Sequence, residues 1–172
     1  MPERVSPLAQ CRPTPRLSQR PYAALVQCHA WPETYAQMAG VLATYCGAPE
    51  VPHVGKAVSG GNGALLRIHP QRLWLVTDRA GDHPALGVDV GATLDLSHAR
   101  TIIHVAEDVA VPLLSRFIAI DLRPHRLAVD DVAITPLHRV SVVLWRRADG
   151  IDILAPRSFA RSIWDVLQGY RT

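Results

Sequence analysis

The sequence predicts an α+β fold in which mixed or antiparallel sheets carry helices on one face. The predicted elements run strand, helix, hairpin, then repeat that order and end in one further helix. Hairpins mixed with helices favour this class over a doubly wound parallel sheet. The two halves are expected to be structurally similar, although no sequence repeat relates them. With 172 residues, 48% of them hydrophobic, the chain can bury a core without metal or disulfide support.

The first half contains one strand, one helix and one hairpin. Residues 22–31 read as a strand and run into a helix over 32–47, where apolar residues recur at helical spacing. Gly47 stands where a helix C-cap belongs. The Pro- and Gly-rich segment 48–63 is expected to be a loop, and 64–77 is expected to form two strands.

The second half repeats this order. Residues 94–106 are expected to form one strand, and 108–118 a helix that can include Pro112 only in its first turn. Residues 131–155 supply two or three strands, the last two joined by an Asp-Gly turn at 149–150.

A closing helix is predicted to begin at Ser158, whose side chain would cap it. Its expected apolar face consists of Phe159, Ile163, Val166, Leu167 and Tyr170.

The predicted strand VSVVLW (140–145) is apolar on both faces and must be covered on both sides. Either the chain's own helices cover this apolar surface, or another protein buries part of it. Tryptophan and arginine commonly anchor protein interfaces. The candidate partner contacts are therefore Trp145, Arg146, Arg147 and Trp164.

The positive charge is concentrated near the N-terminus. The net charge is +3, and residues 1–30 hold four arginines against one glutamate, so the remainder is balanced. A nucleic-acid-binding face is therefore not expected. Residues 1–20 resemble a transit peptide in composition, but their prolines would break its helix. We expect a flexible or extended arm over 1–20, followed by a single domain over 21–172.

The cysteines and the hydropathy favour the cytoplasm. Cys11, Cys28 and Cys46 are odd in number and lack CxxC spacing, which supports neither a disulfide framework nor a zinc site. Such usage is typical of a reducing compartment. No apolar run approaches the roughly 18 residues that a membrane span needs.

A polar cluster stands at the head of the strand predicted over 94–106. Asp95, Ser97 and His98 are the residue types of a nucleophilic triad, and Arg100 follows them. Ser97 and His98 are neighbours, however, and would point to opposite faces of an extended chain. No G-x-S-x-G motif surrounds Ser97. We expect the cluster to satisfy backbone groups at the strand end, with Arg100 able to clamp Asp95.

The remaining motifs do not indicate a site. SGGNG (59–63) lacks the Gly-Lys-Ser/Thr ending of a phosphate loop, and a strand pattern follows it. The eight histidines form no i, i+4 pair and no H-E-x-x-H motif. Asp130, Asp131 and Asp149 are interpreted as turn residues. The sequence thus predicts no catalytic, cofactor-binding or metal-binding residue in this chain.

Three sequence blocks of the second half nevertheless form an ordered set. They are an Asp-x-Ser-His-x-Arg block at 95–100, an Asp-Leu-x-Pro block at Asp121, Leu122 and Pro124, and PRSFA at 156–160 followed by Trp164. In these blocks the chain resembles the gamma subunits of heterotetrameric sarcosine oxidase and the related subunit of N-methylglutamate dehydrogenase.

The similarity covers roughly residues 94–168, with a weaker signal in RLWLVT (72–77). The segment 78–93 is shorter than is usual in that family.

The resemblance implies a fold like the folate-binding domain of aminomethyltransferases. It also implies a structural, non-catalytic role in a complex that oxidatively demethylates sarcosine to glycine and passes the one-carbon unit to tetrahydrofolate. FAD, FMN, NAD and folate would belong to the alpha and beta subunits, and zinc to delta. The N-methyl amine that the complex oxidises stays open.

Two alternatives remain. A free-standing folate-binding module would need a carboxylate in a deep pocket, for which Asp121 and Asp95 are the candidates. A small hydrolase would depend on Ser97 and His98.

Overall fold

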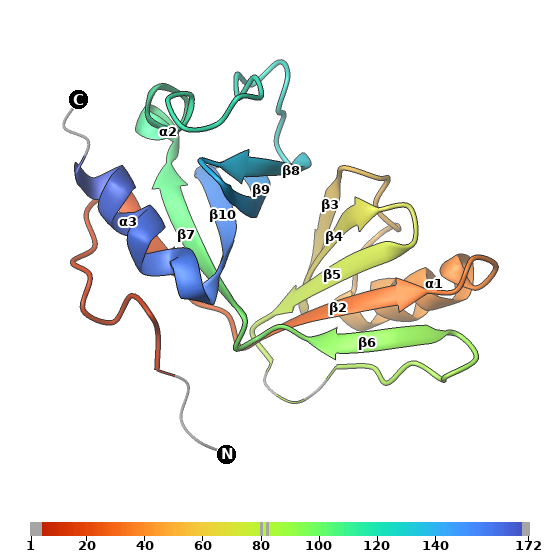
Figure 1. Cartoon of the computed structure of the whole chain (residues 1–172). Coiled ribbons are helices and arrows are strands. Elements are labelled where there is room, and N and C mark those ends of the chain that lie inside the picture. Colours follow the sequence, from red (N-terminus) through yellow and green to blue (C-terminus); the bar gives the residue numbers. More distant parts are fainter. Residues whose placement is uncertain (1–4, 80, 82, 170–172) are drawn as a thin grey trace. The chain divides into compact units, whose positions relative to one another are not determined.

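The computed structural model describes residues 5–79, 81 and 83–169. The chain divides into two compact units, unit 1 comprising Met1–Arg20 with His98–Thr172, and unit 2 comprising Pro21–Ser97. Each unit contains a five-stranded antiparallel sheet, and the chain has three α-helices among its described residues (Figure 1). This confirms the predicted α+β class. The single domain predicted over 21–172 stays a prediction.

Unit 2 packs one helix against its sheet. Met38 and Leu42 of the helix are fully buried in one cluster with Val26, Leu65 and Leu75 of the strands. Gly47 ends the helix in the left-handed conformation, as its position predicts, and its N–H bonds to the Thr44 carbonyl at 3.1 Å. The elements are β2 (Ala24–Ala30), α1 (Tyr35–Cys46), β3 (Ala57–Gly60), β4 (Gly63–His69), β5 (Arg72–Thr77) and β6 (Gly91–Asp95), with strand order β3-β4-β5-β2-β6.

Unit 1 packs two helices against one face of its sheet. Leu113 of the first helix and Trp164 of the second share a core with Ile103 and Ile153 of the strands. The strand order is β1-β7-β10-β9-β8. The elements are β1 (Leu17–Arg20), β7 (Arg100–Ala106), α2 (Glu107–Leu114), β8 (Val132–Leu137), β9 (Val140–Arg147), β10 (Gly150–Pro156), the 3-10 turn η1 (Arg157–Phe159) and α3 (Ala160–Gly169).

The two sheets share one topology. In each, the strand before the helix pairs with the last strand of the following hairpins, as β2 does with β5 and β7 with β10. The fifth strand then lies on the other side of that first strand: β6 beside β2, and β1 beside β7. The predicted similarity of the two halves is therefore present in their strand order.

The structure corrects two predicted elements, the strand over 94–106 and the loop over 48–63. The predicted strand 94–106 is two strands in different sheets, β6 and β7, because the Asp95 side chain accepts the Ser97 N–H at 2.8 Å and turns the chain. The predicted loop 48–63 contains β3. Gly60 ends that strand close to the end of α1, where a Cβ would lie 2.1 Å from the Cys46 carbonyl oxygen. The glycines of 59–63 therefore serve a tight hairpin rather than a flexible loop.

The N-terminal residues expected as an arm end in β1. Leu8 and Leu17 are buried in the core of unit 1, and Ala106 donates its N–H to the Arg16 carbonyl at 3.0 Å. The segment is thus extended over 17–20, where it is a sheet strand.

The helices of unit 1 also differ from expectation. Pro112 is the sixth residue of α2 rather than part of its first turn, and the helix ends two residues later. Ser158 lies inside η1, and α3 begins at Ala160, so the predicted helix start at Ser158 is wrong; no side-chain hydrogen bond caps η1.

The buried face of α3 is rotated from the predicted one. It consists of Ala160, Ile163, Trp164 and Leu167, because the indole of Trp164 turns inward. Phe159 and Val166 are 48% and 37% exposed. Tyr170, predicted on the same face, lies outside the described residues.

Residues Val142–Trp145 of β9 are buried on both faces of the strand, as predicted. Within the described residues, no helix combines the length and apolar character that a bilayer crossing requires.

Replacing Gly150 with alanine should destabilise the protein by about 1–3 kcal/mol, because an overpacked side chain forces the backbone to shift. Its φ is +147°, and a Cβ would lie 2.1 Å from the Val105 carbonyl oxygen and 3.0 Å from His104 Cε1. Gly40→Ala is the matched control, since nothing lies within 4 Å of its Cβ position in α1. Gly40→Ala should stabilise the protein by about 1 kcal/mol, because alanine has a higher helix propensity than glycine. Urea unfolding measures both; equal midpoints for the two variants would contradict the packing argument.

Candidate functional site

The polar cluster predicted at 95–100 divides between the two units. Asp95 and Ser97 belong to unit 2, whereas His98 and Arg100 belong to unit 1. The Ser97 hydroxyl accepts the Leu25 N–H at 3.0 Å and lies 3.5 Å from the Leu25 carbonyl oxygen, to which it donates. The Ser97 carbonyl accepts the Tyr22 hydroxyl at 3.2 Å. The Ser97 hydroxyl is thus hydrogen-bonded to backbone groups of β2, as expected for a residue that stabilises a strand end.

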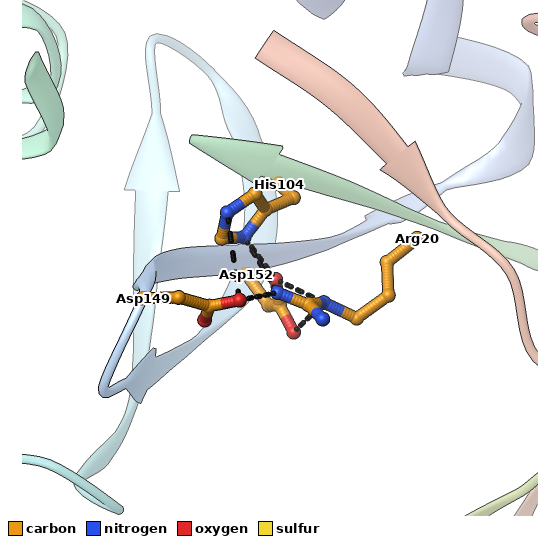
Figure 2. A network of polar contacts seen from close by, with 4 residues as sticks. All are labelled: Arg20, His104, Asp149 and Asp152. Carbon is orange, nitrogen blue, oxygen red and sulfur yellow. Dashed lines mark hydrogen bonds and ion pairs between the residues drawn. The ribbon is translucent and has the colours of Figure 1, made fainter. Parts of the chain in front are cut away.

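A second polar cluster, which sequence reasoning missed, lies within unit 1. Arg20 of β1, His104 of β7, Asp149 of the β9–β10 turn and Asp152 of β10 meet in one cluster (Figure 2). Ile103 and Ile153 face the helix-covered core, so their strand neighbours His104 and Asp152 project from the opposite face of the sheet. We call these four residues the strand-linking network.

The sheet register places the network. His104 stands opposite Ser18 on one side and opposite Asp152 on the other. Arg20 is two residues beyond Ser18 and therefore projects from the same face of β1. The cross-strand neighbours His104 and Asp152 are then within reach of its long side chain.

The contacts of the network centre on one carboxylate. Arg20 Nε donates to Asp152 Oδ1 at 3.0 Å and lies 2.9 Å from Oδ2, and Arg20 Nη2 donates to Asp149 Oδ2 at 2.9 Å. His104 Nδ1 lies 2.8 Å from Asp152 Oδ1 and 2.9 Å from Arg20 Nη2. The Asp152 side chain is fully buried, while 60% of the Asp149 side chain is exposed.

Burial and ion pairing act in opposite directions on the charges. Partial burial lowers the pKa of Arg20, but the hydrogen bond to Asp149 and the charge of Asp152 outweigh it and raise that pKa above its usual value. Burial likewise raises the pKa of Asp149, and the hydrogen bond from Arg20 with its positive charge brings it below the ordinary range. Arg20 and Asp149 are therefore both ionised at neutral pH. Their ion pair stabilises the sheet and does not activate a nucleophile.

Three of the four predicted partner contacts are buried inside the chain. Trp145, Arg146 and Trp164 are each at most 3% exposed. Arg146 pairs with Glu107 and donates to the Leu122 carbonyl at 3.3 Å. Arg147 is partly exposed, with its guanidinium 4.0 Å from the centre of the Trp145 ring. Trp145, Arg146 and Trp164 are therefore not exposed to a partner in this chain, whereas Arg147 stays a predicted contact.

A largely apolar groove lies beside α3. A groove of about 530 Å³ runs between the β8–β9 turn and the exposed flank of the helix. Its lining is mostly apolar and consists of Leu137, His138, Arg139, Val140, Phe159, Ser162, Ile163 and Val166. We call it the α3 groove.

The two buried thiols, Cys28 and Cys46, do not form a reactive site. Burial, together with the neighbouring Cys46 thiol, raises the pKa of Cys28 to about 12, and burial raises that of Cys46 to about 11. Both stay protonated at neutral pH and are poor nucleophiles. Among the residues that the structure describes, no group of three or more His, Cys, Asp or Glu side chains is placed to hold a metal ion.

Replacing Ser97 with alanine should lower stability by about 1–3 kcal/mol, because the buried Leu25 N–H would lose its acceptor. Ser141→Ala is the control, since Ser141 is exposed on β9. That change should alter stability by no more than about 0.5 kcal/mol. Thermal unfolding distinguishes the two, and a neutral Ser97→Ala would exclude the strand-fastening role.

Replacing Arg20 with methionine should cost about 3 kcal/mol, since it leaves the buried Asp152 carboxylate without its cation. The exposed pair Arg123–Asp121 provides the control, because its ion pair at 2.6 Å lies in solvent. Arg123→Met should leave the urea midpoint unchanged. An Arg20→Met protein as stable as the control would show that Asp152 does not depend on Arg20.

The comparisons with known proteins agree with the sequence blocks. No family model matches the chain. One curated relative, sarcosine oxidase subunit gamma from Arthrobacter sp, is 28% identical over 131 residues, which are 73% of this chain and 63% of the relative. The match thus spans less than two thirds of that relative's length.

A solved structure shares the fold over nearly the whole chain. It is a chain of the heterotetrameric sarcosine oxidase from Corynebacterium sp. U-96, with a TM-score of 0.76 and 22% identity, and the match covers 98% of this chain and 97% of that one. At this identity the likeness establishes the fold. Together with the curated relative, it supports the identification made from the sequence blocks: in sequence and in fold, this chain resembles the gamma subunit of sarcosine oxidase.

Proposed function

We propose that the chain is the gamma subunit of a heterotetrameric, flavin-dependent sarcosine oxidase in the cytoplasm. The observation that carries this proposal is the similarity to the Arthrobacter gamma subunit over 73% of the chain, on the fold of a sarcosine oxidase chain. In this role it would assemble with alpha, beta and delta subunits. FAD, FMN, NAD and tetrahydrofolate would be held by those partners, which oxidise sarcosine to glycine and transfer the one-carbon unit.

We assign the chain a structural rather than catalytic role within that complex. Its polar clusters support this assignment, because each satisfies groups of the chain itself. The Ser97 hydroxyl bonds to the Leu25 backbone, and Asp152 bonds to Arg20 and His104. A catalytic acid, base or nucleophile needs an unoccupied direction toward a substrate.

The alternative of a free-standing folate-binding module has weaker support. Of its two candidate carboxylates, Asp121 is engaged by Arg123 at 2.6 Å, and Asp95 is exposed and accepts the Ser97 N–H. A pterin-binding carboxylate should instead lie in a deep pocket, with its oxygens available to the ring.

Isolation of the tagged chain from its native cell should recover a large flavin-containing subunit in a fixed ratio. The recovered assembly should oxidise sarcosine, whereas the chain alone should not. The measurements are flavin absorbance, subunit ratio and sarcosine-dependent oxygen consumption. A stable monomer that is recovered without any flavoprotein would contradict the proposal.

Titration of the purified chain with tetrahydrofolate provides the second measurement. The chain contains four tryptophans as reporters. No saturable change in fluorescence is expected. Saturation at a ratio of one folate per chain would instead favour the one-carbon module.

A further inference from the structure

Helix α3 carries more apolar surface than its own sheet covers. Ala160, Trp164 and Leu167 face the core of unit 1, together with Ile163. A second row consists of Phe159 of η1 and Val166 of α3, which line the groove on either side of the buried Ile163 and are 48% and 37% exposed. A surface helix needs one apolar stripe to pack on its sheet. Phe159 and Val166 are therefore not required by the fold of unit 1.

The opposite wall of the α3 groove is held in place by the β8–β9 turn. His138 has a φ of +53°, and its backbone N–H donates to the Phe117 carbonyl at 3.3 Å. Its ring packs on Phe117, with 5.1 Å between ring centres. Leu137 is buried beneath the groove. A preformed wall of this kind loses little conformational entropy when a partner binds.

The rim of the groove carries an uncompensated positive charge. Arg139 is exposed at the tip of the turn, and no ion pair with a carboxylate forms there among residues 5–79, 81 and 83–169. On the helix, by contrast, Arg161 is neutralised by Asp165, 3.0 Å away. A carboxylate on an incoming surface could bind Arg139 in a charge-assisted hydrogen bond.

From these features we infer that the α3 groove docks a segment of a partner subunit that presents apolar side chains beside a carboxylate. The apolar side chains would cover Phe159 and Val166, and the carboxylate would pair with Arg139. This inference rests on the proposed function, which supplies the partner. A second copy of this chain fits less well: a twofold contact joins the same patch to itself, and the lining of this groove contains no carboxylate that could pair with Arg139.

The test uses the tagged chain in its native cell and changes one groove residue at a time. Val166→Glu places a carboxylate in the apolar row, while Ile134→Glu makes the same change at an apolar residue that is 53% exposed on β8, outside the groove. The readout is the amount of flavin-containing subunit recovered per tagged chain. Val166→Glu should lower it about tenfold or more, since 1.4 kcal/mol of lost affinity is sufficient for that change. Ile134→Glu should retain wild-type recovery.

The charge is tested separately. Arg139→Glu should lower recovery, and the loss should shrink as salt is raised, because exposed charges are screened. Arg126→Glu, at an exposed arginine outside the groove, is the control. Thermal melting of each purified variant checks folding. If Val166→Glu melts early, Phe159→Ala, which only truncates an exposed ring, replaces it.

The outcomes separate the two proposals. If the wild-type chain recovers the flavin-containing subunit and the groove variants recover as much, the docking inference is wrong and the proposed function stands. If the wild-type chain recovers none, both fail. If the purified wild-type chain is a dimer and Val166→Glu makes it a monomer, the occupant is a second copy and the inference is overturned.

Discussion

The sheet of unit 1 depends on one carboxylate that water does not reach. Asp152 is fully buried on β10, and a buried charge is tolerated only when opposite charge and hydrogen bonds surround it. Arg20 supplies the opposite charge, and Arg20 and His104 both lie within hydrogen-bond distance of the carboxylate. They come from β1 and β7, the two strands beyond β10 in the sheet order. The carboxylate therefore requires β1 to be in place, and the four-residue strand β1 gains an anchor that its short ladder could not provide.

The shared topology of the two sheets explains why this anchor is needed. In unit 2 the fifth strand, β6, follows the hairpins directly in sequence and pairs with β2. In unit 1 the equivalent position is taken by β1. The whole of unit 2 lies between β1 and the next strand of that sheet in the sequence. Closing such a long loop costs conformational entropy. The ion pairs of Arg20 offset part of that cost at the point where the strand joins the sheet.

Local features could be predicted from the sequence, and distant ones could not. The Gly47 cap and the β9–β10 hairpin were predictable because a helix cap and a hairpin turn are decided by adjacent residues, although the turn lies at 148–149 and Gly150 already belongs to β10. The contact between Arg20 and Asp152 joins residues 132 positions apart, and no periodicity indicates it. An aspartate within the apolar run IDILA was the one available signal. The buried face of α3 was missed for a related reason, since only the sheet beneath it decides whether Trp164 turns inward.

The same limit applies to the interface. Composition favours tryptophan and arginine as docking anchors, yet Trp145, Arg146 and Trp164 are the side chains that fill the chain's own interior. A large aromatic side chain can be buried within its own chain or against a partner. Burial within the chain is favoured where it removes more apolar area from water. What remains outside is the smaller row of Phe159 and Val166 beside the charge of Arg139. An interface built on such residues would depend on the shape and charge of its groove more than on any single anchor.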